Sequence, residues 1–162
     1  MIFYRSTNGD GKGLSIKAVR ALTTLSLAAY PIGGAIMTVD HPAAKISGLL
    51  VIAASLAFAL PVYGSHVQKI VGEQVHLLDE FELKLRQRAM STAYATFTAL
   101  SLLAVLYFAI GGEAGLWIPR TYDHFNALFW GIFLYASLLP TFFLVWNRQS
   151  ASELADSEDE PR

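Results

Sequence analysis

The chain contains no cysteine and few charged residues, and both shortages limit what it can be. Without cysteine, its 162 residues can form no disulfide, no cysteine-ligated zinc or iron–sulfur centre and no thiol nucleophile. Charged residues make up 15% of the chain, below the roughly 25% of a typical soluble domain, and hydrophobic residues make up 54%. The formal net charge of -1 gives no electrostatic basis for binding nucleic acid. This composition excludes a disordered chain and disfavours an ordinary soluble domain.

Charged residues are missing altogether from four long runs of sequence. The runs contain 19, 20, 24 and 23 residues, so all 25 charged residues fall in the other 76 positions. About 20 apolar residues in a helix cross a hydrocarbon core of about 30 Å, and a helix pairs its own backbone polar groups inside the membrane. We therefore predict an all-α integral membrane protein, an antiparallel bundle of four transmembrane helices near residues 18–39, 46–65, 89–112 and 125–147.

Basic residues are distributed unevenly between the links that join these runs. Ten of the twelve lie before the first run, between the second and third, or after the fourth, and only Lys45 and Arg120 lie in the other two links. The positive-inside rule then predicts a multi-pass protein with both termini and the central link in the cytoplasm. The first run is longer than the hydrophobic region of a cleaved signal peptide, so we expect it to remain in the protein.

Both terminal tails and the central link are expected to be cytoplasmic. We predict a tail at residues 1–16, a membrane domain at 17–147 and an acidic, disordered tail at 148–162. The link at 66–88 carries apolar residues at helical spacing between Val71 and Ala89. It is predicted to form an amphipathic helix that continues into the third span or lies on the membrane surface.

The four charge-free runs contain no histidine either. Intramembrane catalysis, proton-coupled transport and a haem held by mid-span histidines all need such groups at depth, so we expect no enzymatic activity and no cofactor. The third span does carry a polar face at spacings of three, four and three residues: Ser91, Tyr94, Thr98 and Ser101. We interpret it mainly as a helix-packing surface, like the small residues Ala53 and Ala57 of the second span. A polar cavity or substrate path is the alternative.

The first run is interrupted by Pro31-Ile32-Gly33-Gly34. Proline removes a backbone hydrogen bond, and glycine allows a neighbouring backbone to approach closely. We expect a structural kink here, with a broken-helix binding site as the alternative.

Two Asp-His dipeptides lie on the predicted outer side. Asp40-His41 follows the first span and Asp123-His124 opens the fourth. Their nitrogen and oxygen atoms could hold zinc or another divalent ion if the first and fourth helices are neighbours. Interfacial histidines without any metal are the interpretation that we favour.

The segment Asp79-Glu80-x-Glu82-x-x-x-Arg86-x-Arg88-Ala89 resembles a D-E-x-E-x-x-x-R-x-R-A segment that precedes a membrane helix in small, uncharacterised bacterial membrane proteins. The resemblance covers residues 78–89 and implies a protein of the bacterial inner (cytoplasmic) membrane. It brings no substrate and no catalytic residue with it.

These observations favour a non-enzymatic interaction or accessory component of the membrane. Glu80, Glu82, Arg86 and Arg88 would contact a partner protein or lipid headgroups. The expected surroundings are the lipid bilayer and a membrane protein partner or a second copy of the chain. A small transporter or channel, as a monomer or a homo-oligomer, is the first alternative, and a metal-binding membrane protein is a weaker one.

Overall fold

The computed structural model describes residues 14–72 and 78–158, except for the side chains of 148–158. All regular structure in this part of the chain is helical, which confirms the predicted all-α class. The helices are α1 (Ile16–Met37), α2 (Pro42–Tyr63), α3 (His66–Gly72), α4 (Glu80–Ala114) and α5 (Tyr122–Glu158).

Local sequence signals explain where several of these helices begin and end. Ser15 caps α1 because its hydroxyl accepts a hydrogen bond from the Ala18 N–H at 3.2 Å. Asp79 caps α4 in a similar way, accepting from the Glu80 N–H at 2.7 Å. At the other end of α4, Gly115 adopts the left-handed conformation, with φ of 70°, and its N–H bonds to the Gly111 carbonyl.

Three of the helices are long and apolar enough to cross a membrane: α2, α4 and the part of α5 between Tyr122 and Asn147. They contain the second, third and fourth predicted spans. α1 is also 22 residues long, but Thr23, Thr24, Ser26 and Tyr30 and the basic residues of its first turns make it less apolar. A membrane-embedded helical protein is therefore supported, with three candidate spans within the described residues.

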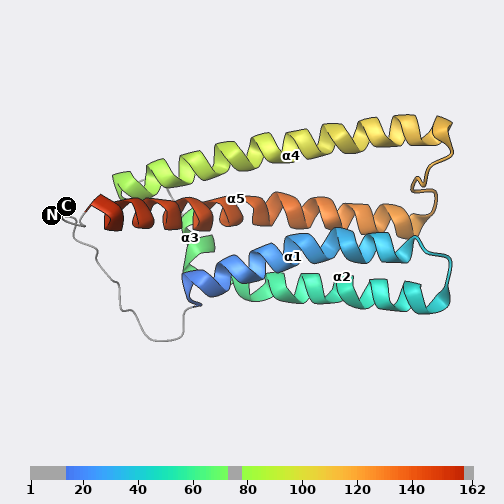
Figure 1. Ribbon diagram of the computed structural model, residues 1–162, viewed down its shortest axis with the longest axis horizontal. Coiled ribbons are helices and arrows are strands. Elements are labelled where there is room, and N and C mark those ends of the chain that lie inside the picture. The colour runs from blue at the N-terminus through green and yellow to red at the C-terminus, as the bar shows by residue number, and fades with distance from the viewer. Residues whose placement is uncertain (1–13, 73–77, 159–162) are drawn as a thin grey trace.

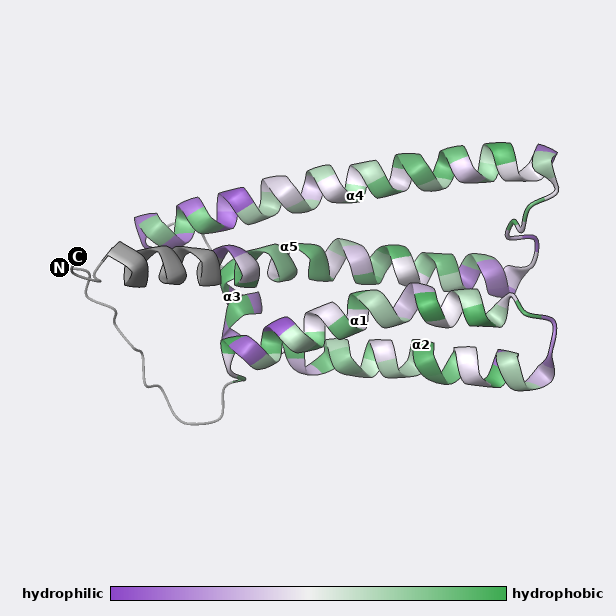
Figure 2. Cartoon of the chain, in the orientation of Figure 1, coloured by the Kyte–Doolittle hydropathy of each residue, from purple (hydrophilic) through white to green (hydrophobic). Residues whose placement is uncertain are grey.

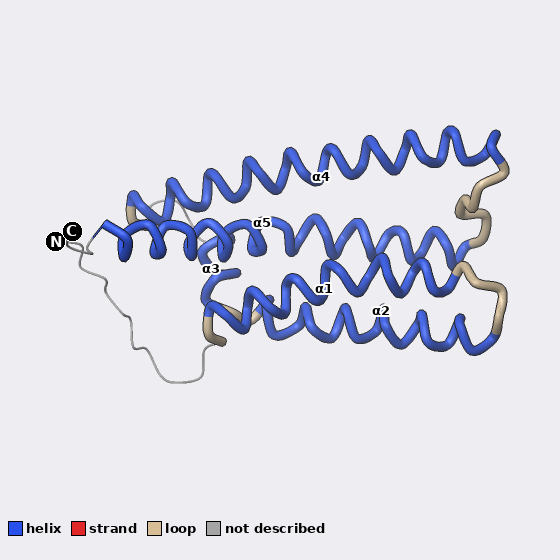
Figure 3. The backbone as a smooth tube through the Cα atoms, in the orientation of Figure 1, coloured by secondary structure: helices blue, strands red, loops and turns tan. Residues whose placement is uncertain are grey.

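The four long helices form two helical hairpins, α1–α2 and α4–α5, whose connecting loops lie at the same end of the molecule (Figures 1 and 3). The helices lie in the order α4, α5, α1, α2, and neighbours in this order run antiparallel (Figure 1). α5 contacts all the other helices, whereas α4 packs on α5 and touches α3. The arrangement is an open row of helices in which α4 forms one edge.

Among the described helices, α1 and α2 share the most extensive contact. The Ser26 hydroxyl donates to the Ser55 carbonyl at 2.8 Å, and the Ser55 hydroxyl donates back to the Ser26 carbonyl at 2.7 Å. Two turns further along α1, Gly33 faces Gly48. A Cβ built on Gly33 would lie 2.9 Å from the Gly48 carbonyl oxygen. Of the two glycines expected to admit a neighbouring backbone, Gly33 does so and Gly34 does not, and α1 continues as one helix through Pro31. Ala53 and Ala57 are exposed, so the predicted packing role of this pair is not seen within the chain.

Tyrosine hydroxyls connect this hairpin to α5. Tyr30 donates to the Ala127 carbonyl at 2.5 Å, and Tyr135 donates to the Leu27 carbonyl at 2.7 Å. Tyr63 and the Ser137 hydroxyl lie 2.6 Å apart and share a hydrogen bond. Interhelical bonds of this kind are typical of membrane proteins, in which burial of apolar surface gives little drive for helix association.

The segments predicted to be cytoplasmic differ from the predictions in two respects. The link 66–88 is divided: α3 ends at Gly72, and a new helix starts at Glu80 and continues without a break into the third span. Val75, one of the apolar residues of the predicted single helix, lies outside the described residues. The chain predicted to be disordered from 148 is helical as far as Glu158, because no glycine or proline interrupts α5 after Pro140.

Candidate functional site

His41 and His124, the histidines predicted to lie on the outer side, are each engaged by the backbone of their own loop. His41 precedes α2, and its Nδ1 accepts a hydrogen bond from the Ala43 N–H at 3.2 Å. His124 lies in the first turn of α5, and its Nδ1 accepts from the Arg120 N–H at 3.2 Å. In a neutral imidazole whose Nδ1 accepts, Nε2 carries the proton. In each ring Nδ1 is thus engaged by the backbone, and Nε2 is the nitrogen that remains.

The neighbouring carboxylates are placed in water. Asp40 forms an ion pair with Lys45 at 2.9 Å, and this hydrogen bond and the positive charge of Lys45 lower the pKa of the Asp40 carboxyl. Asp123 is exposed in the first turn of α5. Among the described side chains, those of residues 14–72 and 78–147, no group of three or more His, Cys, Asp or Glu could hold a metal ion. The predicted site at Asp40, His41, Asp123 and His124 gains no support from these contacts.

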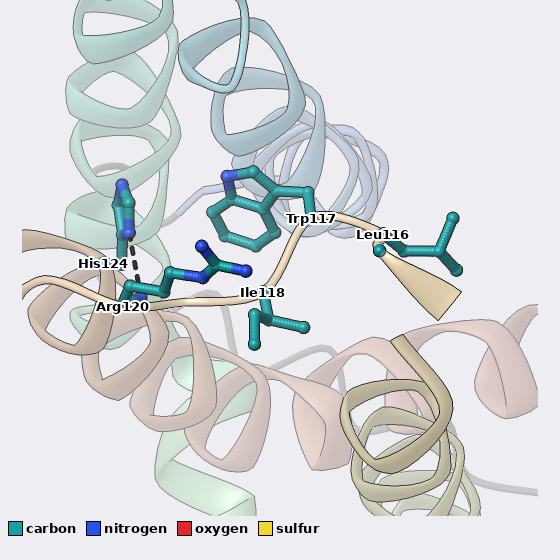
Figure 4. A pocket seen from close by; sticks show the side chains of 6 residues that line it. Leu116, Trp117, Ile118, Arg120 and His124 are labelled. Carbon is teal, nitrogen blue, oxygen red and sulfur yellow. Dashed lines mark hydrogen bonds between the residues drawn. The ribbon is translucent and has the colours of Figure 1, made fainter. Parts of the chain in front are cut away.

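The loop between α4 and α5 surrounds a small, open hollow of about 280 Å³ (Figure 4). Trp117 and His124 meet edge to face across it, with ring centroids 5.2 Å apart. The Tyr107 hydroxyl donates to the Trp117 carbonyl at 2.9 Å and so fixes the loop to α4. The lining supplies an imidazole, a guanidinium from Arg120 and an indole, with neither a carboxylate nor a hydroxyl beside them. These side chains can contact a lipid headgroup. They do not include a hydroxyl or thiol nucleophile that the imidazole could activate as a base.

The predicted contact residues Glu80, Glu82, Arg86 and Arg88 all lie in the first three turns of α4. Glu80 and Glu82 complement the positive end of the helix dipole, which stabilises the start of α4. Glu80 and Arg88 are exposed, while Glu82 and Arg86 are partly buried. The four residues surround the helix: Glu80 and Arg88 lie on its exposed side, and Glu82 and Arg86 lie on the side of the buried Ala89. Together they make up the hydrophilic end of α4 in Figure 2.

A second basic group lies at the same end of the protein. The guanidinium of Arg20 on α1 lies 3.5 Å from the ring centroid of Trp146 on α5, within the range of a cation–π contact. The two residues are 126 positions apart in the sequence, and nothing in either local segment indicates the contact.

The polar face of the third span faces away from the rest of the chain. Ser91, Tyr94 and Ser101 are exposed and Thr98 is partly buried. Contact with α5 is made instead through Ala89 and Ala93, which are buried on another side of α4. No helix of the described chain covers these four hydroxyl residues.

Comparison of the chain with protein-family models, with curated proteins and with solved structures gives no match. The resemblance of residues 78–89 to a segment of small bacterial membrane proteins therefore stays a prediction. Arguments about function have to come from the arrangement of the helices and of their side chains.

Proposed function

We propose that this chain is an integral protein of the bacterial inner membrane with four antiparallel transmembrane helices: α1 crosses the membrane in addition to α2, α4 and α5. The distribution of side chains on α1 supports this assignment. Its polar residues Thr23, Ser26 and Tyr30 are buried against neighbouring helices, whereas Leu25 and Ile32 are more than half exposed. A helix with its polar groups inside and its apolar groups outside suits lipid and not water.

The proposed topology can be tested on the natural chain background because it contains no cysteine. Single cysteines at Leu14, Asp40 and Lys69 would be labelled in intact cells with a membrane-impermeant maleimide. Four spans predict labelling at Asp40→Cys alone, with Leu14→Cys and Lys69→Cys reacting only after the membrane is opened. Equal labelling at Leu14→Cys and Asp40→Cys in intact cells would mean that α1 does not cross, and would overturn the assignment.

Within this topology, the proposed function is that of a non-enzymatic interaction or accessory component. The observation that carries it is the length of two helices. α4 and α5 contain 35 and 37 residues, against 22 in α1 and in α2. At about 1.5 Å per residue, the excess of α4 over α2 is roughly 20 Å of helix that a bilayer does not need. On α4 this excess is the charged surface from Glu80 to Arg88, which can bind a partner protein by electrostatic complementarity.

Charge reversal at the start of α4 tests the proposal. The variant Glu80→Lys with Glu82→Lys should lose a protein that co-purifies with the tagged chain from membranes. The matched control is Glu113→Lys, which reverses one exposed acid at the opposite end of the same helix. A partner that is retained in the double variant, or lost equally in the control, would contradict a role for this surface.

A further inference from the structure

The hydroxyl groups of the membrane helices fall into two classes. In α1, α2 and α5 as far as Asn147, every serine, threonine and tyrosine except Tyr122 at the outer end of α5 has a hydrogen-bond partner within the chain. Some of these bonds join helices, as between Ser26 and Ser55, and others return to a carbonyl of the same helix. These helices are therefore self-sufficient in an environment that offers no water.

α4 is different. Thr92 donates to the Arg88 carbonyl and Tyr107 to the Trp117 carbonyl. Five other hydroxyl residues form no hydrogen bond with any residue that the structure describes: Ser91, Tyr94, Thr96, Thr98 and Ser101. The side chain of Tyr94 is 74% exposed. In the most apolar 18-residue segment of α4, only 6% of the residues are buried, compared with 22% in the corresponding segment of α2 and 39% in that of α5.

Four of these five residues form a single stripe. Ser91, Tyr94, Thr98 and Ser101 recur at intervals of three, four and three residues, which is the spacing of the contact positions in a left-handed pair of helices. At 3.6 residues per turn, the centre of this hydroxyl stripe lies about 130° around α4 from the buried residues that face α5. A further helix can therefore pack on the stripe without displacing α5.

We propose that the hydroxyl stripe of α4 pairs with the same stripe of a second copy of this chain in the same membrane. Acyl chains have no hydrogen-bonding group, so a hydroxyl that faces lipid can bond only within its own chain, as the Thr92 hydroxyl bonds the Arg88 carbonyl; the hydroxyls of the stripe form no such bond with the described residues. A hydroxyl both donates and accepts, and a stripe of hydroxyls is therefore complementary to itself. Two copies inserted in the same direction bring their α4 helices together in parallel, about a two-fold axis normal to the membrane, with Thr98 and Ser101 opposite their own equivalents.

The proposal concerns the membrane-embedded face of α4 and is independent of the charged surface from Glu80 to Arg88. It requires only that α4 spans the bilayer. Glu80→Lys with Glu82→Lys should therefore abolish partner capture and leave the dimer intact, so the two proposals can fail separately.

Disulfide cross-linking in liposomes tests the interface directly, since the chain has no other cysteine. Ser101→Cys and Thr98→Cys should give a covalent dimer under mild oxidation. Leu103→Cys is the matched control: it lies at nearly the same depth on α4, is exposed, and points to another side of the helix. Equal cross-linking of Leu103→Cys would indicate random collisions and overturn the proposal, as would the absence of a dimer at both stripe positions.

A second measurement uses no cysteine. Energy transfer between labelled copies in liposomes should show that the combined variant Ser91→Ala, Tyr94→Phe, Thr98→Val and Ser101→Ala dimerises roughly tenfold or more weakly, since each interhelical hydrogen bond in a membrane contributes modestly. Unchanged dimerisation would contradict the proposed role of the hydroxyls. The alternative occupants give distinct results. Labelling of Ser101→Cys by a small water-soluble thiol reagent would indicate a water-filled path, and a monomer bound to a different protein would indicate a hetero-complex; either result overturns the pairing of two copies.

Discussion

Adding one methyl group at Gly33 should separate the α1–α2 pair, whereas the same change at Gly34 should not. A Cβ on Gly33 would lie 2.8 Å from Ile52 Cγ1, 2.9 Å from the Gly48 carbonyl oxygen and 3.0 Å from the Ile52 backbone nitrogen. Two of these three atoms belong to the backbone of α2, so a side-chain rotation cannot relieve the contact. At Gly34, on the same helix, a Cβ meets no atom within 4 Å.

The size of the effect follows from these distances. An ordinary contact begins at 3.4 Å, so relief of the 2.9 Å contact requires the helices to move apart by 0.5 Å. Overpacking of this kind typically costs about 1–3 kcal/mol, which corresponds to a fall in the unfolding midpoint of roughly 2–12 °C for a chain of this size. Gly34→Ala should leave the midpoint unchanged or raise it slightly, because alanine favours the helix.

Thermal unfolding in detergent, followed by tryptophan fluorescence, gives both midpoints under identical conditions. Gly48→Ala provides an internal check, since its Cβ would lie 2.7 Å from the Gly33 carbonyl oxygen across the same interface. Once one substitution has separated the helices, the other should cost less, so the double variant should lose less stability than the sum of the two single variants. The reasoning is refuted if Gly33→Ala is no more destabilising than Gly34→Ala.

Three further predictions concern the polar contacts. Ser26→Ala and Ser55→Ala should each destabilise the protein by about 0.6–1.7 kcal/mol; the two changes should be coupled in a double-mutant cycle, and strict additivity would contradict the reciprocal bonds. Tyr135→Phe should cost a similar amount, about 0.6–1.7 kcal/mol, through loss of its bond to the Leu27 carbonyl; Tyr122→Phe, at an exposed position, is the control and should show no change in unfolding midpoint. Lys45→Gln should raise the pKa of Asp40, measured by a carboxyl NMR titration, because Lys45 lowers that pKa in the folded protein. The ion pair contributes stability above the unfolded pKa of Asp40 and loses it as the pH falls through the lower folded value, so an Asp40 titration that is identical in Lys45→Gln would show that the pair does not persist in solution.

The positions of the helices could be predicted because charge is excluded from lipid. The charge-free runs 46–65, 89–112 and 125–147 lie almost entirely within α2, α4 and α5, and the run 21–39 overlaps α1. The ends were less accurate, because a helix does not stop where the membrane stops. Asp79 caps α4 ten residues before its charge-free run begins, and α5 continues as a helix beyond Asn147.

The contacts between helices could not be predicted in the same way. α2 is apolar on every side, so its sequence gives no direction to the face that packs, and Ala53 and Ala57 were as plausible as Gly48 and Ser55. One signal was available: Ser26 and Gly33 are seven residues apart, as are Gly48 and Ser55, in the order that an antiparallel pair requires. The bonds from Tyr30 and Tyr135 join residues 97 and 108 positions apart, a separation over which a single sequence carries no pairing information.

The same type of residue has opposite consequences in α1 and in α4. In α1 the hydroxyl residues lower the mean hydropathy of the helix, yet Thr23, Ser26 and Tyr30 are paired inside the protein, and the surface left outside is apolar. In α4 the average is apolar, but the unpaired hydroxyls lie outside. Mean hydropathy counts polar groups whether or not they are hydrogen-bonded. It is therefore low for α1, whose hydroxyls have partners in the chain, and high for α4, several of whose hydroxyls have none among the described residues. What decides the behaviour of each helix in lipid is where its hydroxyls point: those of α1 are hydrogen-bonded within the chain, whereas the hydroxyl stripe of α4 is the surface proposed to pair with a second copy.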